Sequence, residues 1–176
     1  MSPLQDLDQT YIAFWPQDGS SSYGPFQVKL ISEKLEAGFT ERRLTLRKHN
    51  QSTEREIKML QLDSWPMRDP VPQSPHSIIT VLHEVERWQH QRGNKTILVT
   101  CWDGASRCGL FCAASIILQQ IRLEGLVDVF QAVKTIRSSR PQAIGTSDQY
   151  SFCYQVAQAY LNTRTSNNYE NIEQPH

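Results

Sequence analysis

A cysteine and an arginine separated by five residues are the part of this sequence best suited to chemistry. The apolar residues 97–99 precede Cys101, and Arg107 is followed by a glycine and an apolar helical pattern. The pattern predicts a buried strand, a tight loop and a helix start, whose N–H groups and dipole together form an anion cradle. This field favours a cysteine thiolate, and an arginine can bind two oxygens of a phosphate. The alternative is a buried cysteine before an ordinary turn, with an arginine that only caps the helix.

The overall composition excludes several classes of protein. The chain has 176 residues with 18 basic and 18 acidic side chains, so binding to nucleic acid is not expected. Four cysteines without a CxxC pair argue against a disulfide framework, and the spacing of cysteines and histidines argues against a zinc site. No apolar run is long enough to span a membrane. The length favours one domain.

The elements before the Cys101 loop must position it. Residues 26–30 and 43–47 alternate between apolar and polar side chains, and residues 56–62 form a third candidate, so a set of antiparallel strands is expected. Residues 64–72 contain three prolines, which exclude a helix and leave a connector or a lid. Ser74 and Pro75 are typical of a helix N-cap and first position, and Gly93 is typical of the stop.

Three further helices are expected after the loop. Two cover residues 110–123 and 127–136, and a third begins where Thr146 and Gln149 form a capping box. The polar residues 163–176 are expected to be a disordered tail, and residues 1–10 an irregular segment. Strands followed by helices favour an α+β or a mixed-sheet α/β domain, which occupies residues 11–162.

An ordered set of short motifs over residues 11–162 resembles the protein tyrosine phosphatase family. The motifs are Phe14-Trp15-Pro16, Tyr23-Gly24, Trp65-Pro66, Cys101 to Gly109, residues 127–130, Arg140-Pro141 and residues 148–150. They are most similar to the C-terminal part of the second, membrane-distal domain of receptor-type enzymes. The resemblance implies a twisted mixed β-sheet flanked by helices, with the N-terminal part missing. It also implies a place on the cytoplasmic side of the plasma membrane, in a single-pass receptor, with no membrane segment in this chain.

The resemblance also assigns roles to individual residues. Cys101 stands at the position of the nucleophile and Arg107 at that of the phosphate clamp, and an aspartate on the lid would be the general acid. The phosphate-binding loop would comprise Trp102, Asp103, Gly104, Ala105, Ser106 and Arg107; the lid would open with Trp65, Pro66 and Met67; and Gln149 would position the hydrolytic water. The implied substrate is a phosphotyrosine protein or peptide, and no cofactor or metal is implied.

Several positions depart from the family pattern. Met67 stands where the general-acid aspartate is expected, and Asp69, two residues later, is a weaker candidate for that role. Thr100 replaces a histidine and Cys108 replaces a hydroxyl residue, while Asp103 brings a carboxylate to the anion cradle. These departures predict a pseudophosphatase, or a very weak enzyme, that regulates or binds phosphotyrosine, partner proteins or another phosphatase domain within or between molecules.

Three other interpretations stay open at this point. The first is an active tyrosine phosphatase that works through a phosphocysteine intermediate, with Asp69 as a displaced acid. The second is a redox-sensing thiol domain, because Cys101, Cys108 and Cys112 are close in sequence. The third concerns the tail, where Tyr169 with Asn171 two residues later is a candidate phosphosite for an adaptor, or an incidental tyrosine.

Overall fold

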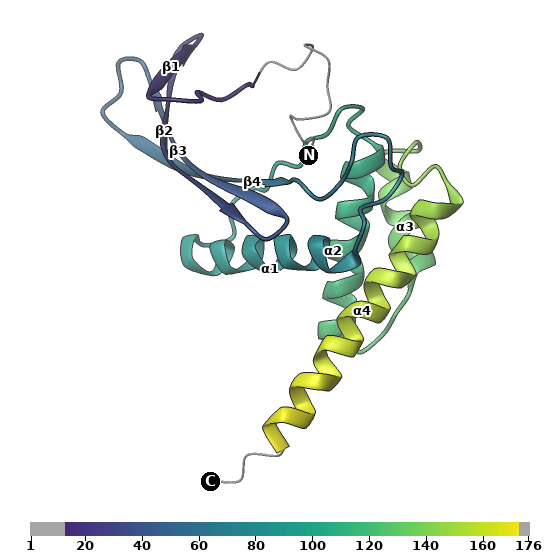
Figure 1. Ribbon diagram of the computed structural model, residues 1–176. Coiled ribbons are helices and arrows are strands. Elements are labelled where there is room, and N and C mark those ends of the chain that lie inside the picture. The colour runs from purple at the N-terminus through teal and green to yellow at the C-terminus, as the bar shows by residue number, and fades with distance from the viewer. Residues whose placement is uncertain (1–12, 173–176) are drawn as a thin grey trace. The chain divides into compact units, whose positions relative to one another are not determined.

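The computed structural model describes residues 13–172, with side chains up to residue 165. The described residues form two compact units, 13–67 and 68–172. The first contains the strands and the second contains the helices, as Figure 1 shows along the colour bar. A four-stranded sheet together with four helices confirms the expected α/β class.

The sheet unit is an antiparallel meander. Its strands are β1 (Ser20–Tyr23), β2 (Phe26–Glu36), β3 (Phe39–Lys48) and β4 (Glu54–Leu62), and each pairs with the next in sequence. This arrangement confirms the three strands expected from the sequence, at residues 26–30, 43–47 and 56–62. Gly38 has a φ of +90°, which allows the tight β2–β3 turn that pairs Glu36 with Phe39.

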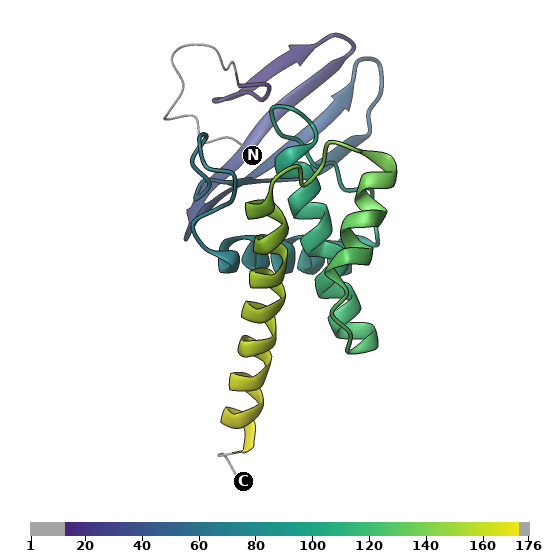
Figure 2. The same cartoon turned by 90° about the vertical axis from the view of Figure 1, so that its right-hand side faces the viewer.

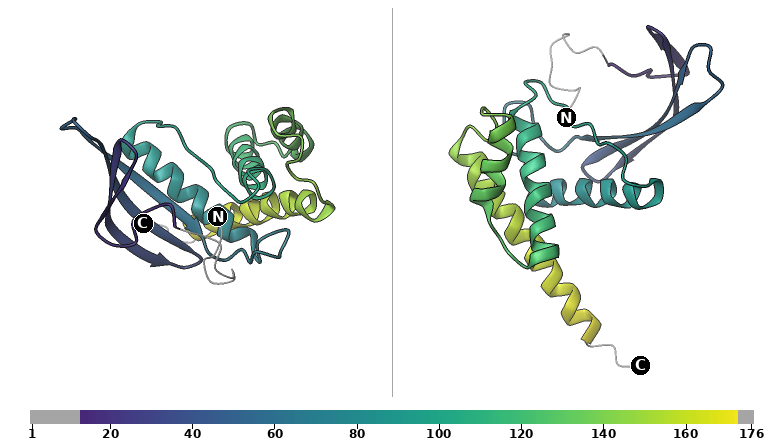
Figure 3. Two further views of the ribbon diagram at one scale, coloured as in Figure 1. Left: turned by 90° about the horizontal axis from the view of Figure 1, so that it is seen from above. Right: turned by 180° about the vertical axis from the view of Figure 1, so that it is seen from behind.

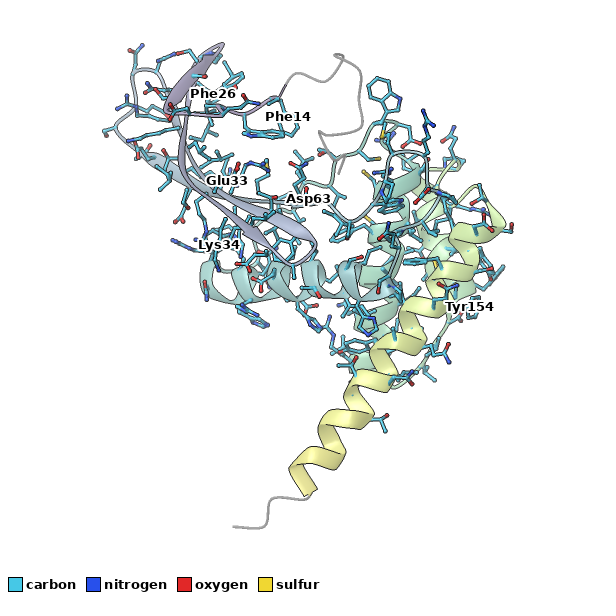
Figure 4. All side chains as sticks on the ribbon, in the orientation of Figure 1. Phe14, Phe26, Glu33, Lys34, Asp63 and Tyr154 are labelled. Carbon is cyan, nitrogen blue, oxygen red and sulfur yellow. The ribbon has the colours of Figure 1, made fainter. Side chains whose placement is uncertain are left out.

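A buried arginine on β3 links three strands of this unit. Arg42 donates from Nε to Glu33 on β2 at 2.5 Å and from Nη1 to Gln61 on β4 at 2.8 Å. Its guanidinium lies 4.7 Å from the centre of the Trp15 ring. Thr40 donates to Asp63 at 2.6 Å, and Glu33 and Asp63 are labelled in Figure 4. These bonds satisfy a buried charge and hold the strands in register.

The helical unit contains α1 (Pro75–Arg92), α2 (Ser106–Glu124), α3 (Val129–Ser139) and α4 (Ser147–Ile172). Short-range caps explain where the helices begin, as the sequence predicted for two of them. The Ser74 hydroxyl accepts from His76 N at 3.3 Å, and Thr146 Oγ1 accepts from Gln149 N at 3.2 Å. Gly93 ends α1 with a φ of +69°.

Helix α2 is the centre of the helical unit. It contacts each of the other three helices, and Figures 2 and 3 show it beside α3 and α4. Several of its side chains have no exposed surface, namely those of Leu110, Ala113, Ala114, Ile117 and Leu118. The helix that follows the Cys101 loop is therefore anchored along its length.

The expected strand at residues 97–99 does not form. Residues 95–101 have no regular secondary structure, and the side chains of Ile97 and Leu98 are 51% and 85% exposed. A strand needs a hydrogen-bonded neighbour, and within residues 13–172 the sheet consists of β1 to β4 only. The described sheet is consequently antiparallel throughout instead of mixed.

The C-terminal helix is longer than expected. Helix α4 continues to Ile172, whereas disorder was predicted from residue 163. No glycine or proline lies between Gly145 and Pro175, and extending an existing helix avoids the cost of nucleating a new one. The predicted irregular segment 1–10 and the end of the tail from residue 173 lie outside the described residues.

Candidate active site

The loop of residues 101–107 joins an irregular segment to the first turn of α2. Gly104 has a φ of +63°, a left-handed conformation that a glycine adopts without strain. Helix α2 begins at Ser106, earlier than the predicted start at residue 110, and Gly109 N donates to Ala105 O at 2.7 Å. Arg107 is therefore in the first turn of the helix, where it is buried, and Cys101 is half-buried.

The Asp103 carboxylate accepts hydrogen bonds from both the backbone and the side chains of this loop. Its Oδ1 atom lies 3.0 Å from Ala105 N and 3.0 Å from Ser106 N, and its Oδ2 atom accepts from the Ser106 hydroxyl. The Cys101 thiol donates to Oδ1 at 3.2 Å. The N-cap residue Ala105 has no polar side chain, so Asp103 satisfies the first N–H groups of α2.

These bonds decide the charge of Asp103. Partial burial would raise the pKa of this carboxyl group, but the hydrogen bonds from Ser106, Ala105 and Cys101 outweigh burial and hold the pKa well below its usual range. The carboxylate is therefore ionised at neutral pH and lies at the helix N-terminus, where an anion is favoured. The sequence predicted that Asp103 lies beside the anion cradle. It did not predict these hydrogen bonds, because the helix was expected to begin at residue 110 and not at Ser106. An aspartate before a helix start is a signal for such capping.

Two further thiols are influenced by Cys101. Burial raises the pKa of Cys108 to about 12, with a contribution from its hydrogen bond to Cys101. Burial also raises the pKa of Cys112, with a smaller electrostatic contribution from Cys101. On the first turns of α2, Cys108 and Cys112 therefore remain neutral thiols at physiological pH.

The start of α2 packs closely against the turn after α3. A Cβ atom built on Gly109 would lie 2.5 Å from the Cβ of Ala143 and 3.3 Å from its Cα, so the close approach requires glycine. Arg137 holds this turn by donating from Nε to Ala143 O at 3.1 Å and from Nη2 to Ile144 O at 2.5 Å. The sequence offered no local signal for the contact with Ala143.

The remaining predicted site residues lie on both units. Trp65 is buried and Pro66 and Met67 are half-buried at the end of the sheet unit, whereas Asp69 is exposed at the start of the helical unit. The roles of these lid residues, including that of Asp69 as an acid, stay predictions.

Gln149 is buried at the start of α4, and its Nε2 atom donates to Pro70 O at 3.2 Å. The amide thus holds the segment that follows the predicted lid, and its water-positioning role stays a prediction. Trp102 is 70% exposed. Farther along α4, Tyr150 and Tyr154, the latter labelled in Figure 4, lie edge to face with ring centres 5.6 Å apart. Tyr169 lies on the helical backbone near the end of α4, beyond the described side chains, so its role as a phosphosite also stays a prediction.

Comparison with known proteins identifies the class to which this fold and loop belong. Residues 2–159 match the family model of protein-tyrosine phosphatases, so the chain belongs to the protein tyrosine phosphatase family. It is 38% identical over 162 residues to human receptor-type tyrosine-protein phosphatase alpha, and the matched region covers 92% of this chain and 20% of that protein.

Other receptor-type members of the family are similar to this chain. Chicken receptor-type tyrosine-protein phosphatase U is 32% identical over 165 residues, covering 90% of this chain and 12% of that protein. Mouse receptor-type tyrosine-protein phosphatase epsilon is 34% identical over 162 residues, covering 89% and 23%. The chain thus spans about a fifth of the length of the human relative. None of the described helices combines the length and the apolar character that a membrane-spanning segment requires.

Proposed function

We propose that this chain is part of a catalytically impaired receptor-type tyrosine phosphatase domain that retains a role in binding phosphotyrosine or partner proteins. One contact carries the proposal: the Cys101 thiol donates a hydrogen bond to the Asp103 carboxylate at 3.2 Å. In the family reaction the cysteine must lose its proton and attack phosphorus to form a phosphocysteine. A carboxylate at this distance engages the thiol of the nucleophile position, and its negative charge repels an incoming phosphate.

The size of this repulsion is large enough to matter for the reaction. Two unit charges about 6 Å apart at an effective dielectric constant of about 20 repel each other by about 3 kcal/mol. This is roughly a hundredfold in binding, and it is an upper figure because salt and solvent screen an exposed carboxylate such as Asp103. The charge of Asp103 therefore disfavours the substrate complex.

Two substitutions add to the effect of Asp103. Met67 carries no proton that it can donate to a leaving tyrosine oxygen, and loss of a general acid typically lowers the rate by about 10²–10⁴. Cys108, at the position of a hydroxyl residue, presents a thiol, which is a weak hydrogen-bond donor. Together, the changes at Asp103, Met67 and Cys108 favour a role in binding partners over a role in phosphate hydrolysis.

The proposed setting follows the receptor-type relatives. The domain would lie on the cytoplasmic side of the plasma membrane in a single-pass receptor and would bind a phosphotyrosine protein, or another phosphatase domain in the same or a second molecule. A phosphorylated Tyr169 would recruit an adaptor that grips the phosphate with an arginine.

The test is an activity assay with an aryl phosphate on the chain and on C101S, with an active tyrosine phosphatase domain as the reference. We expect the chain and C101S to be equally slow, because Cys101 does not act as an efficient nucleophile. A second measurement compares the affinities for a phosphotyrosine peptide and its unphosphorylated form, and we expect a preference for the former. Robust turnover that C101S abolishes would overturn the proposed impairment.

A further inference from the structure

The Asp103 carboxylate uses the same groups that an oxyanion would need. Ala105 N and Ser106 N each lie 3.0 Å from Oδ1, and the Ser106 hydroxyl donates to Oδ2. These donors belong to Ala105 and Ser106, the N-cap and the first residue of α2. They lie at the N-terminal end of the helix, where the helix dipole is positive. A carboxylate and a phosphate make the same kind of charge-assisted hydrogen bond with such donors.

We propose that Asp103 is an internal occupant of the oxyanion cradle, so that any phosphate, free or on a peptide, binds only after the Asp103 carboxylate has left it. This inference rests on the proposed function, because it assumes that residues 101–107 form the cradle. Asp103 would therefore set the affinity of the loop for oxyanions. In the absence of a ligand, the Asp103 carboxylate would occupy the N–H groups that an oxyanion needs.

The physical reason is direct competition. A backbone N–H group makes one strong hydrogen bond, so Ala105 N and Ser106 N cannot serve the carboxylate and a phosphate oxygen together at full strength. When only a fraction of molecules has an open site, the apparent affinity falls by that fraction. Asp103 is exposed, so rotation of its side chain would move the carboxylate into solvent and free both N–H groups.

Competition for the N–H groups and loss of charge alone predict different effects of two neutral replacements. In D103N the side-chain amide oxygen still accepts from Ala105 N and Ser106 N, so the cap persists while the charge is lost. In D103A no side-chain acceptor remains, so the charge and the occupant of both N–H groups are lost together. Occupancy of the cradle therefore predicts that D103A binds oxyanions more tightly than D103N, whereas loss of charge alone predicts equal affinities in the two variants.

The experiment is a titration of the chain and both variants with inorganic phosphate at neutral pH and constant ionic strength. Amide resonances of Ala105 and Ser106 in ¹⁵N NMR report binding at the loop itself. We expect D103A to bind phosphate at least tenfold more tightly than the unmodified chain, and more tightly than D103N. The matched control is E124Q, which removes the same charge at the exposed C-terminal end of α2 and should leave the affinity unchanged.

The outcomes separate this inference from the proposed function. Equal phosphate affinity in D103A and D103N, with loss of binding in R107A, would overturn the occupancy of the cradle and leave the cradle itself intact. A gain in E124Q as large as that in D103A would also overturn it, because net charge alone would then explain the effect. Absence of phosphate binding in every variant would overturn both the inference and the phosphate-binding part of the proposed function.

Discussion

Replacing Gly109 with alanine tests how the start of α2 is held in place. The added methyl group would lie 2.5 Å from the Cβ of Ala143 and 3.3 Å from its Cα. Carbon atoms in contact are normally about 3.5–4.0 Å apart, so one side must move by about 1 Å. Ala143 is fully buried, and Arg137 binds its carbonyl oxygen at 3.1 Å, so the turn resists this movement.

Two effects of opposite sign determine how much G109A changes the free energy of unfolding. Inserting a methyl group into a packed interior typically costs about 1–3 kcal/mol. The higher helix propensity of alanine offsets this by up to about 1 kcal/mol. We therefore expect G109A to lower the free energy of unfolding by about 1–2 kcal/mol, whereas propensity alone predicts that G109A stabilises the protein.

The assay is urea unfolding of the whole chain, followed by circular dichroism of the helices. The control is a double-mutant cycle with A143G, which removes the methyl group that the new side chain meets. We expect G109A to cost less in the A143G background than in the unmodified chain, by about 1 kcal/mol or more. An increase in stability in G109A, or additive effects in the cycle, would refute the close packing of α2 against this turn.

Three further changes test the loop and its helices. G104A and G125A should each lower the free energy of unfolding by about 1–2 kcal/mol, because both glycines have positive φ (+63° and +68°) and open space around them; equal stability to the parent chain would contradict this. D128A should cost about 1 kcal/mol in the same urea assay, because Asp128 Oδ1 accepts from Gln131 N at 2.8 Å, while D128N should cost much less. The pKa of Asp103 lies below its unfolded value of about 4, so Asp103 stabilises the fold above pH 4 and loses this effect as the pH falls toward the folded pKa. The urea midpoint should consequently fall more steeply in acid for the parent chain than for D103N, and parallel curves would argue against the hydrogen bonds to Asp103.

Several elements could be predicted because their signals are local. Ser74 and Pro75 start α1 and Gly93 ends it, while Thr146 caps α4, since each of these contacts joins residues within one helical turn. The strands β2 to β4 follow from alternation, because one face of each strand differs from the other in polarity.

Two predictions of secondary structure were wrong, because local composition does not show whether a segment has a partner elsewhere in the chain. Residues 97–99 are apolar, like a buried strand, but a strand forms only beside a partner, and the side chains of Ile97 and Leu98 are largely exposed. The polar residues after 162 suggested disorder, yet a helix needs no partner strand and α4 continues to Ile172.

Spacing along the chain places Cys101, Asp103 and Arg107 within one short segment at the start of a helix, because this spacing is a covalent property. Packing of the folded chain brings Ala143, far along the sequence, against Gly109 at the start of α2. Packing also sets the direction of the Asp103 side chain, whose carboxylate accepts from Ala105 N and Ser106 N. Side-chain direction and contacts between distant segments depend on packing, which spacing along the chain does not encode.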